Sequence, residues 1–483
     1  MEKYITNDEF REGCRCARLF WLEKHNACSY SAGTALSDVA KSYIKGGRYV
    51  KDDIPEKMAE STVRLLSAGQ RIIKNPAFIT SGAFCRADII RIDKMGMATI
   101  YFSRPALHVR RVFAREAALL MAAAEEAGLE KVRVVILLPD KTYVKCGAID
   151  ARKFLAAYDL SEDARQLKDK ASVRASALSA IAKWENEPEV DLHSGCFSPD
   201  GCKYFSHCTA HLPQPNVFKI ARLSQNTKLK LYNEGKYSYE ELKDHPLLTD
   251  SQKNQVKMSL SEADAQVKKR ELEEFLSSLW YPMCFLDFES WQPAVPPSDM
   301  MKAFEQVPFQ YSLHIVESEG ADVEHKEYLA DGCADPRVEL AHRLAEDVPE
   351  GACVIVYNKQ FEKMVIADLA RLCPDIADKL TKISGGICDL MVPFQKKLYY
   401  DRRMEGSFSM KAVLPALFPN SPELCYENLC GVHNGSQAMQ TYAKMSEMSG
   451  EDLRLTRENL LKYCGLDTYG MVKILEKLRD SVK

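Results

Sequence analysis

The segment CFLDFES, from Cys284 to Ser290, places two acids inside an apolar run. Its length and residue types predict a buried β-strand. Side chains two residues apart on a strand share one face of the sheet, so Asp287 and Glu289 project together. Burying two carboxylates without positive partners costs several kcal/mol, and their like charges repel each other. A divalent cation removes both penalties, and Mg²⁺ or Mn²⁺ prefers carboxylate oxygens. The alternative is an edge strand whose polar face lies in solvent.

Two later segments carry further acids. The apolar run from Val354 to Val356 predicts a second strand, followed by Asn358 and then by Glu362 in the first turn of a predicted helix. We expect the Asn358 side chain to cap this helix and Glu362 to face the carboxyl end of the strand. In LLKYCGLDTYGMV, Tyr463 and Asp467 are four residues apart and share one face of a predicted helix. Taken singly, Glu362 is typical of a surface acid, and the last segment is typical of an amphipathic helix.

The order of these segments resembles the DnaQ-like 3′–5′ exonuclease family, which has the ribonuclease H-like fold. The resemblance implies that Asp287, Glu289, Glu362 and Asp467 bind two Mg²⁺ or Mn²⁺ ions, in a DEDD-type site with Tyr463 as its aromatic residue. Two such ions hold the attacking water and the leaving 3′ oxygen of a phosphodiester. With an ordinary pKa near 10, Tyr463 is a poor base and is expected to orient the water. Glu362 departs from the family, which usually has Asp at the third acid.

The resemblance extends along the chain. PFQYSLHI, CDLMVPF, YYDRRMEGSFSMKAVLPAL and YCGLDTYGMV resemble a bacterial family catalogued as a domain of unknown function, in which an exonuclease-like domain follows a RecB-like nuclease module. In GSFSMK, Ser407, Ser409 and Lys411 precede a predicted helix and are candidates for holding a substrate phosphate, together with Asn358. The alternative is an ordinary helix cap with a solvated lysine. Asp389 is expected to cap a helix rather than to orient a ligand.

A cysteine cluster lies near the end of the first module. Cys196, Cys202 and Cys208 follow at even intervals, wider than the spacing usual for structural zinc. Cys16 is the expected fourth ligand and Cys14 the alternative. This pattern resembles RecB-like iron–sulfur nucleases, and it implies a [4Fe–4S] cluster held by four thiolates. Zinc, or three packed thiols without a metal, remain the alternatives.

The same module lacks the acids of a working RecB-like (PD-(D/E)XK-type) nuclease. Asp88 in CRADIIRID fits the first acid, but the next predicted strand, ATIYFSRPA, has neither Glu nor Lys. We therefore expect no nuclease activity from this module. Two basic stretches are candidates for binding a phosphate backbone, or are solvated faces: Arg104, Arg110, Arg111 and Arg115, and then Lys219, Arg222, Lys228 and Lys230.

The 483 residues are too many for one core. We predict an α/β protein with a RecB-like, restriction-endonuclease-type module at 1–212, a helical connector at 213–278 and a ribonuclease H-like mixed-sheet domain at 279–483. No apolar run reaches the roughly 18–20 residues that span a bilayer. The polar start lacks a signal-peptide core, so we expect a cytoplasmic protein with reduced thiols and no membrane contact.

These patterns predict a metal-dependent 3′–5′ exonuclease acting on single-stranded DNA or RNA ends. A net charge of -3 means that only local basic patches can hold nucleic acid. The first alternative is a nucleic-acid-binding or assembly protein without activity. The second is an endonuclease that uses the N-terminal module.

Overall fold

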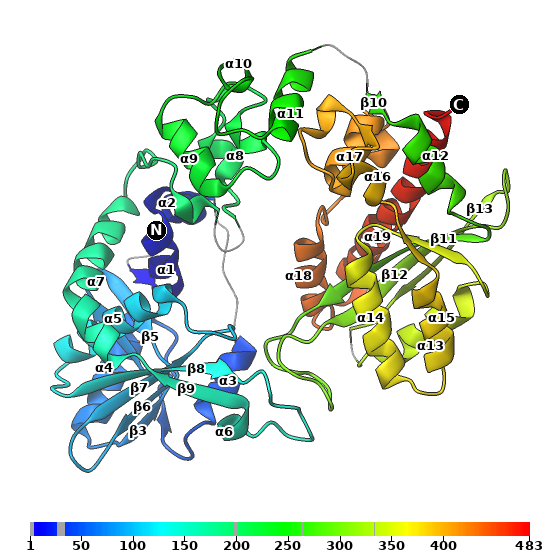
Figure 1. Ribbon diagram of the computed structural model, residues 1–483. Helices are drawn as coiled ribbons and strands as arrows, with labels where there is room; N and C mark the ends of the chain where they lie inside the picture. The colour runs from blue at the N-terminus through cyan, green and yellow to red at the C-terminus, as the bar shows by residue number, and fades with distance from the viewer. Residues whose placement is uncertain (1–3, 27–33, 198–200, 262–264, 333) are drawn as a thin grey trace. The chain divides into compact units, whose positions relative to one another are not determined.

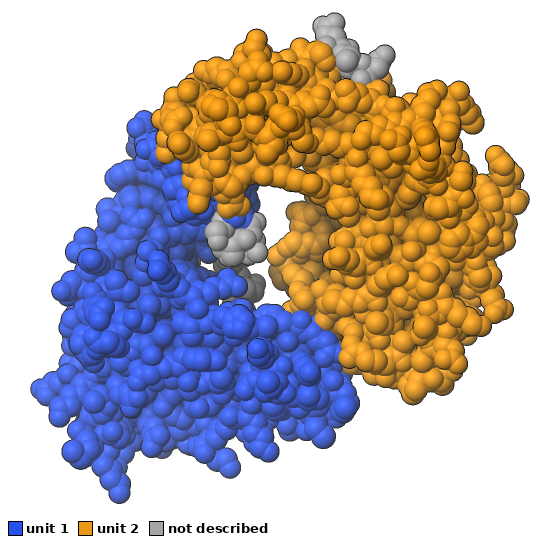
Figure 2. Space-filling model, viewed as in Figure 1, with its two compact units in different colours: residues 1–209, 293–305 blue, residues 210–292, 306–483 orange. Residues whose placement is uncertain are grey.

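The computed structural model of the protein describes residues 4–26, 34–197, 201–261, 265–332 and 334–483. The chain forms two compact units (Figure 2). Unit 1 comprises Met1–Thr209 and Pro293–Glu305, and unit 2 comprises Ala210–Gln292 and Gln306–Lys483. The connector predicted at 213–278 therefore groups with unit 2. The general α/β expectation is confirmed. Among the described residues, no helix is both long and apolar enough to cross a membrane.

Unit 1 is built on a six-stranded mixed sheet with the order β2-β3-β6-β7-β8-β9 (Figure 1). The β2–β3 and β7–β8 pairs are parallel and the other pairs are antiparallel. A second sheet has the order β1-β5-β4. The segment CRADIIRID is divided between the two sheets, because its first residues belong to β5 and Ile89–Ile92 form β6. The strands of unit 1 are β1 Ile5–Thr6, β2 Arg48–Tyr49, β3 Ile72–Lys74, β4 Ala77–Thr80, β5 Ala83–Arg86, β6 Ile89–Ile92, β7 Ala98–Ser103, β8 Val132–Pro139 and β9 Leu155–Asp159.

The main core of unit 1 forms around a buried, alanine-rich helix, α5 (Arg111–Glu126). Its small side chains allow close packing against α7 (Ser161–Ile181) and β8. The first helix, α1 (Asn7–Arg15), begins with a capping box between Thr6 and Glu9. The other helices of unit 1 are α2 Ala17–His25, α3 Thr34–Lys41, α4 Pro55–Ser67, α6 Ala151–Phe154, η1 Ser194–Cys196 and α8 Phe205–Cys208.

Unit 2 contains a five-stranded mixed sheet with the order β13-β12-β11-β14-β15. The first three strands are antiparallel, and β14 and β15 run parallel to β11. This confirms that the second half of the chain has a mixed sheet. Its strands are β11 Met283–Trp291, β12 Val307–Val316, β13 Val323–Leu329, β14 Cys353–Val356 and β15 Ile387–Asp389.

Helices cover both faces of this sheet (Figure 1). Cys284, Leu286 and Phe288 of β11 belong to the core on the side of α13 (Arg337–Asp347), α14 (Lys359–Leu372) and α15 (Ala377–Gly385). Met283 and Phe285 point to the opposite core, formed with α17 (Met410–Leu417), α18 (Gly435–Met445) and α19 (Gly450–Asp480). The two-residue period of the strand therefore directs both acids of β11 toward α19.

The connector has a small core of its own, which includes Val217, Leu231, Leu242 and Val256. Met258, near its end, joins the larger core of unit 2, so the connector packs on the second domain. The remaining elements of unit 2 are η2 Val217–Lys219, α9 Gln225–Asn233, α10 Tyr239–Leu242, α11 Asp250–Leu260, β10 Gln266–Val267, α12 Lys269–Ser277, α16 Val392–Gln395, β16 Tyr399–Tyr400, η3 Arg402–Met404, η4 Pro422–Leu424 and η5 Tyr426–Asn428.

Candidate metal centre

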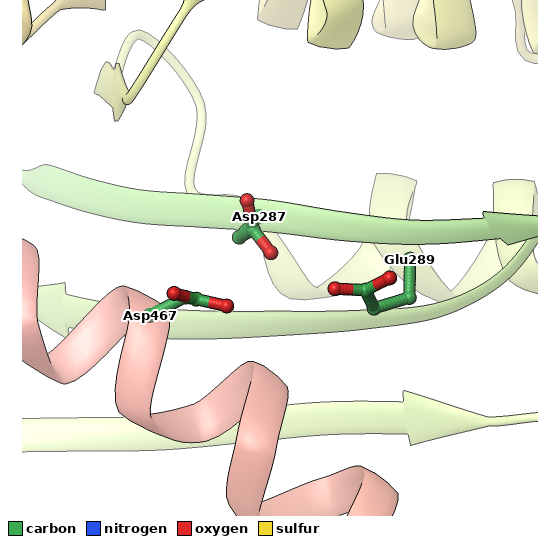
Figure 3. Close-up of side chains that lie close together, drawn as sticks. All are labelled: Asp287, Glu289 and Asp467. Atoms are coloured by element: carbon green, nitrogen blue, oxygen red, sulfur yellow. The ribbon is translucent and has the colours of Figure 1, made fainter. Parts of the chain in front are cut away.

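Three of the four predicted metal ligands meet in unit 2. One ligand oxygen from each of Asp287, Glu289 and Asp467 lies within 4.8 Å of the other two (Figure 3). The first two side chains project from β11, and the third projects from the facing surface of α19. Asp467 is held there because its helix buries Cys464 and Met471 against the sheet. Among the described residues, this is the one group of acids, cysteines and histidines close enough together to hold a metal ion in this way.

The three carboxylates have abnormal proton affinities. Burial raises the pKa of Asp287 well above its ordinary value, and the charges of Asp467, Glu289 and Glu362 raise it further. Burial and the charge of Asp467 raise the pKa of Glu289 in the same way. The pKa of Asp467 is also raised by burial, although hydrogen bonds from Tyr426 and Tyr463 oppose the shift. The group therefore requires protons or cations to neutralise it.

Glu362, the fourth predicted ligand, lies beside this group but outside it. It sits in the first turn of α14 and is 2% exposed. Its Oε2 is buried and has no hydrogen-bond partner among the described residues. Burial raises the pKa of Glu362 to about 8. A buried carboxylate oxygen without a partner is unusual, and a cation is one group that satisfies it.

Asn358 precedes α14, but its side chain makes no cap hydrogen bond, so the capping prediction is wrong. Its backbone is left-handed, with φ of 85°. Asp389, at the end of β15, accepts hydrogen bonds from the backbone N–H groups of Asn358 and Lys359, both at 3.2 Å. An ionised carboxylate is a stronger partner than an amide for the positive end of a helix. The expectation that Asp389 caps a helix is confirmed.

The carboxylates lie in a cleft of about 460 Å³ whose walls include the predicted substrate-binding residues Asn358, Ser407, Ser409 and Lys411. Ser409 precedes α17 without a side-chain cap hydrogen bond, so its hydroxyl is not used as a cap. It lies 3.1 Å from the hydroxyl of Ser407. The rest of the wall is largely aromatic or apolar: Phe288, Tyr357, Met391, Phe408, Met410 and Tyr463.

Lys411 brings the positive charge nearest to the acids. Its Nζ lies 5.5 Å from the ring centroids of both Tyr426 and Tyr463, and it donates to the carbonyl oxygen of His433 at 3.0 Å. Burial lowers the pKa of Lys411, and the charges of Asp467 and Glu289 act in the opposite direction. The lysine predicted to be either a phosphate ligand or a solvated residue is thus exposed to solvent, and its charge acts on Glu289 and Asp467.

Tyr426 is a site residue that the sequence did not indicate. Its hydroxyl donates a hydrogen bond to Oδ1 of Asp467. It lies in the short helix η5, and the segment SPELCYENLC has no periodic pattern that would distinguish this tyrosine from any other. Only the fold of this segment against α19 brings it to the site.

Four thiols meet in unit 1. Cys16, Cys196, Cys202 and Cys208 line one small closed cavity, and Cys14, the alternative ligand, does not. Burial raises the pKa of Cys196 and of Cys202, as do the charges of neighbouring thiols. No three of these sulfurs lie within 4.8 Å of one another. In tetrahedral zinc sites the sulfurs are about 3.8 Å apart, as follows from Zn–S distances of about 2.3 Å.

Asp88, the candidate acid of the N-terminal module, lies apart from the group of acids that could bind a metal ion. Asp88 is buried, and its carboxylate accepts hydrogen bonds from the hydroxyls of Ser37 and Ser103. Burial raises its pKa. Beside it, Arg104 forms a salt bridge with the fully buried Glu116. Among the described residues, Asp88 belongs to no group of three or more acids, cysteines or histidines that could hold a metal ion.

The two basic stretches are partly occupied by structural contacts. Besides Arg104, Arg115 donates to the carbonyl oxygen of Cys14. In the second stretch, Lys219 forms a salt bridge with Glu405 at 2.6 Å, and Lys228 donates to the carbonyl oxygen of Phe218. The stretches are therefore not continuous phosphate-binding surfaces. Arg110, Arg111 and Arg222 remain exposed.

Comparison with known proteins places a family match on the second half of the chain. A family model described as a domain of unknown function (DUF2779) matches residues 284–409. That range contains Asp287, Glu289 and Glu362 but ends before Lys411 and Asp467. No curated protein and no solved structure matches the chain.

Proposed function

We propose that unit 2 is a ribonuclease H-like, metal-dependent 3′–5′ exonuclease that hydrolyses phosphodiester bonds of DNA or RNA. The observation that carries this proposal is the convergence of Asp287, Glu289 and Asp467 within 4.8 Å in a cleft that also contains Lys411. Asp287 and Asp467 are separated by 180 residues of sequence. Burying the three carboxylates together costs free energy, and a structural role alone does not offset that cost.

The donor set fits Mg²⁺ or Mn²⁺. All candidate ligands are carboxylates, the hard oxygen donors that these ions prefer, and Glu362 adds a buried oxygen without a partner. When bound, two such ions stabilise the attacking and leaving oxygens of an in-line displacement. Asp287, Glu289 and Asp467 would hold them, with Glu362 reaching in from α14.

The surrounding residues position these ligands and the substrate. Tyr426 and Tyr463 hydrogen-bond to Asp467 and fix the orientation of its carboxylate. Burial raises the pKa of Tyr463, so its hydroxyl keeps its proton and donates it to Asp467. Its oxygen can then accept a hydrogen bond from the water that it orients, and it does not act as a base. Lys411 supplies a charge for a non-bridging phosphoryl oxygen, and Ser409 supplies a hydroxyl.

The proposed substrate is the unpaired 3′ end of a strand. The carboxylates lie between walls of apolar and aromatic side chains, which suit a single unstacked nucleotide. Single-stranded DNA and RNA are both tested, because the proposal covers both.

The test uses the full-length protein with oligonucleotides labelled at the 5′ or the 3′ end, in Mg²⁺ or Mn²⁺. We expect a ladder of shortened 5′-labelled products, which EDTA prevents. Asp287→Asn and Asp467→Asn should each abolish it, whereas Glu346→Gln, at an exposed position on α13, should not. Absence of shortening by the wild-type protein in either metal would refute the proposal.

One observation favours a second candidate, a nucleic-acid-binding protein without activity. Glu362 lies outside the group of three carboxylates, so the structure brings together within 4.8 Å three of the four predicted ligands and not all four. Oligonucleotide binding that is not followed by shortening in either metal would support this candidate.

For unit 1, we propose a RecB-like module that holds a [4Fe–4S] cluster through Cys16, Cys196, Cys202 and Cys208 and has no nuclease activity of its own. Four thiols around one cavity support the cluster. The hydrogen bonds from Ser37 and Ser103 to Asp88, which belongs to no group of three or more metal ligands among the described residues, support the loss of activity. Iron, acid-labile sulfide and zinc are measured in anaerobically purified protein. One zinc and no iron would refute the cluster, and cleavage that Asp88→Asn removes would refute the inactivity.

A further inference from the structure

Three cations of unit 2 lie where the start of α11, the strand β10 and the turn after α16 are joined by hydrogen bonds. They are Arg222, Lys268 and Lys397, and we call them the cation cluster. Lys397 Nζ donates to the hydroxyl of Ser251 on α11, at 3.0 Å. The backbone N–H of Lys268 donates to the carbonyl oxygen of Leu398, at 2.8 Å, where β10 pairs with β16.

Arg222 lies at the same place because the residue before it in the chain, Ala221, is hydrogen-bonded to α11. The side-chain amide of Gln252 on α11 donates to the carbonyl oxygen of Ala221 at 3.1 Å. The pKa of Lys397 is consistent with this gathering, because burial lowers it and the charges of Arg222 and Lys268 lower it further. Three segments that are distant in sequence thus bring like charges together.

Among the described residues, no carboxylate forms a salt bridge with any member of the cation cluster. The adjacent cations differ in this respect, since Lys219 is paired with Glu405 at 2.6 Å and Arg403 with Asp401. Like charges without acid partners repel one another when they lie close together, and a bound anion offsets this repulsion. Lys397 is further restrained over the ring of Tyr400, with its Nζ 5.5 Å from the ring centroid.

The cation cluster is connected to the proposed active site by a short helix. Met391 lines the cleft, and α16 (Val392–Gln395) leads from it to Lys397. Lys397 follows Met391 by six residues, four of which form α16. Phe394 of α16 also stacks against Tyr357 of the cleft wall, with their ring centroids 6.5 Å apart.

We propose that the cation cluster binds the phosphate backbone of a single strand, upstream of the 3′ end that enters the cleft. The inference rests on the proposed exonuclease function, which supplies the strand and its direction. Lys and Arg side chains without acid partners suit phosphates, and contacts of this kind position a strand without reading its sequence.

The test measures binding of 5′-labelled single-stranded DNA and RNA to the full-length protein by fluorescence anisotropy, in EDTA, over a range of KCl concentrations. Each phosphate contact adds about 0.7 to the slope of log affinity against log salt for a single strand. We expect Arg222→Gln, Lys268→Gln and Lys397→Gln each to reduce this slope by about 0.7, and the triple variant to reduce it by about 2.

Two variants serve as controls. Lys379→Gln removes an exposed charge from α15 and should leave the slope unchanged. Lys397→Arg keeps the charge and should retain most of the slope, which separates loss of charge from loss of folding. An unchanged slope in a folded triple variant overturns the proposal. So does competition by poly-glutamate as strong as that by the oligonucleotide, because this would indicate an acidic protein partner.

Failure of the two proposals can be distinguished. If the triple variant loses the salt slope but the wild-type protein shortens no oligonucleotide in Mn²⁺, the exonuclease proposal fails and the binding surface stands. If shortening proceeds and the triple variant retains the slope, the binding surface fails and the exonuclease stands.

Discussion

Replacing Glu362 by glutamine should stabilise the metal-free protein, and only at high pH. The folded protein raises the pKa of this carboxyl from 4.5 to about 8, because burial penalises the charged form. Between these two values the folded state holds a proton that the unfolded chain has released. The free energy of unfolding therefore falls as the pH rises from about 4.5 through about 8.

The magnitude follows from the shift. One pKa unit corresponds to about 1.4 kcal/mol, so the penalty is about 4 kcal/mol at pH 8 and less than about 1 kcal/mol at pH 5. Glutamine has the shape of the protonated acid but never ionises, so Glu362→Gln removes the penalty. At about 2–4 °C per kcal/mol, unit 2 should melt roughly 8 °C or more higher at pH 8.

The assay is thermal unfolding in EDTA at pH 5 and pH 8, followed by circular dichroism. Glu346→Gln, an exposed change on α13, is the matched control and should shift neither transition. Adding Mn²⁺ at pH 8 should raise the melting temperature of the wild-type protein, because a bound ligand stabilises by about 2.7 kcal/mol at a hundred times its Kd. Equal stabilisation by Glu362→Gln at both pH values, or none at pH 8, would refute the reasoning.

Three further predictions concern single side chains. Tyr426→Phe removes the hydrogen bond to Asp467, worth about 1.5–3 kcal/mol for a charged acceptor, so kcat/KM for oligonucleotide shortening should fall about 10- to 100-fold without loss of folding. Lys411→Gln should lower kcat for single-turnover shortening about 100-fold or more, because it removes a positive charge directed at the phosphoryl group. An unchanged kcat would show that Lys411 is a solvated residue without a role in the reaction. Cys202→Ser should lose iron and lower the melting temperature of unit 1 while the shortening rate of unit 2 is retained, as determined by iron analysis, calorimetry and the oligonucleotide assay.

Some features of the site could be predicted because they depend on local periods. The two-residue period of a strand places Asp287 and Glu289 on one face, and the helical period places Tyr463 and Asp467 together. The sequence also indicated the mixed sheet of the second half, through the order of its apolar runs. These properties are determined by neighbours in the chain, and tertiary packing preserved them.

Other features depended on contacts between distant segments. Only the folded structure brings Tyr426 to Asp467, gives the cap of α14 to Asp389 in place of Asn358, and leaves Glu362 beside the three other acids. It also pairs Arg104 with Glu116 and thereby removes that arginine from the basic stretch. The sequence by itself determined which face each side chain occupies, whereas the packing of distant segments decided which faces meet, because long-range contacts leave no periodic signal along the chain.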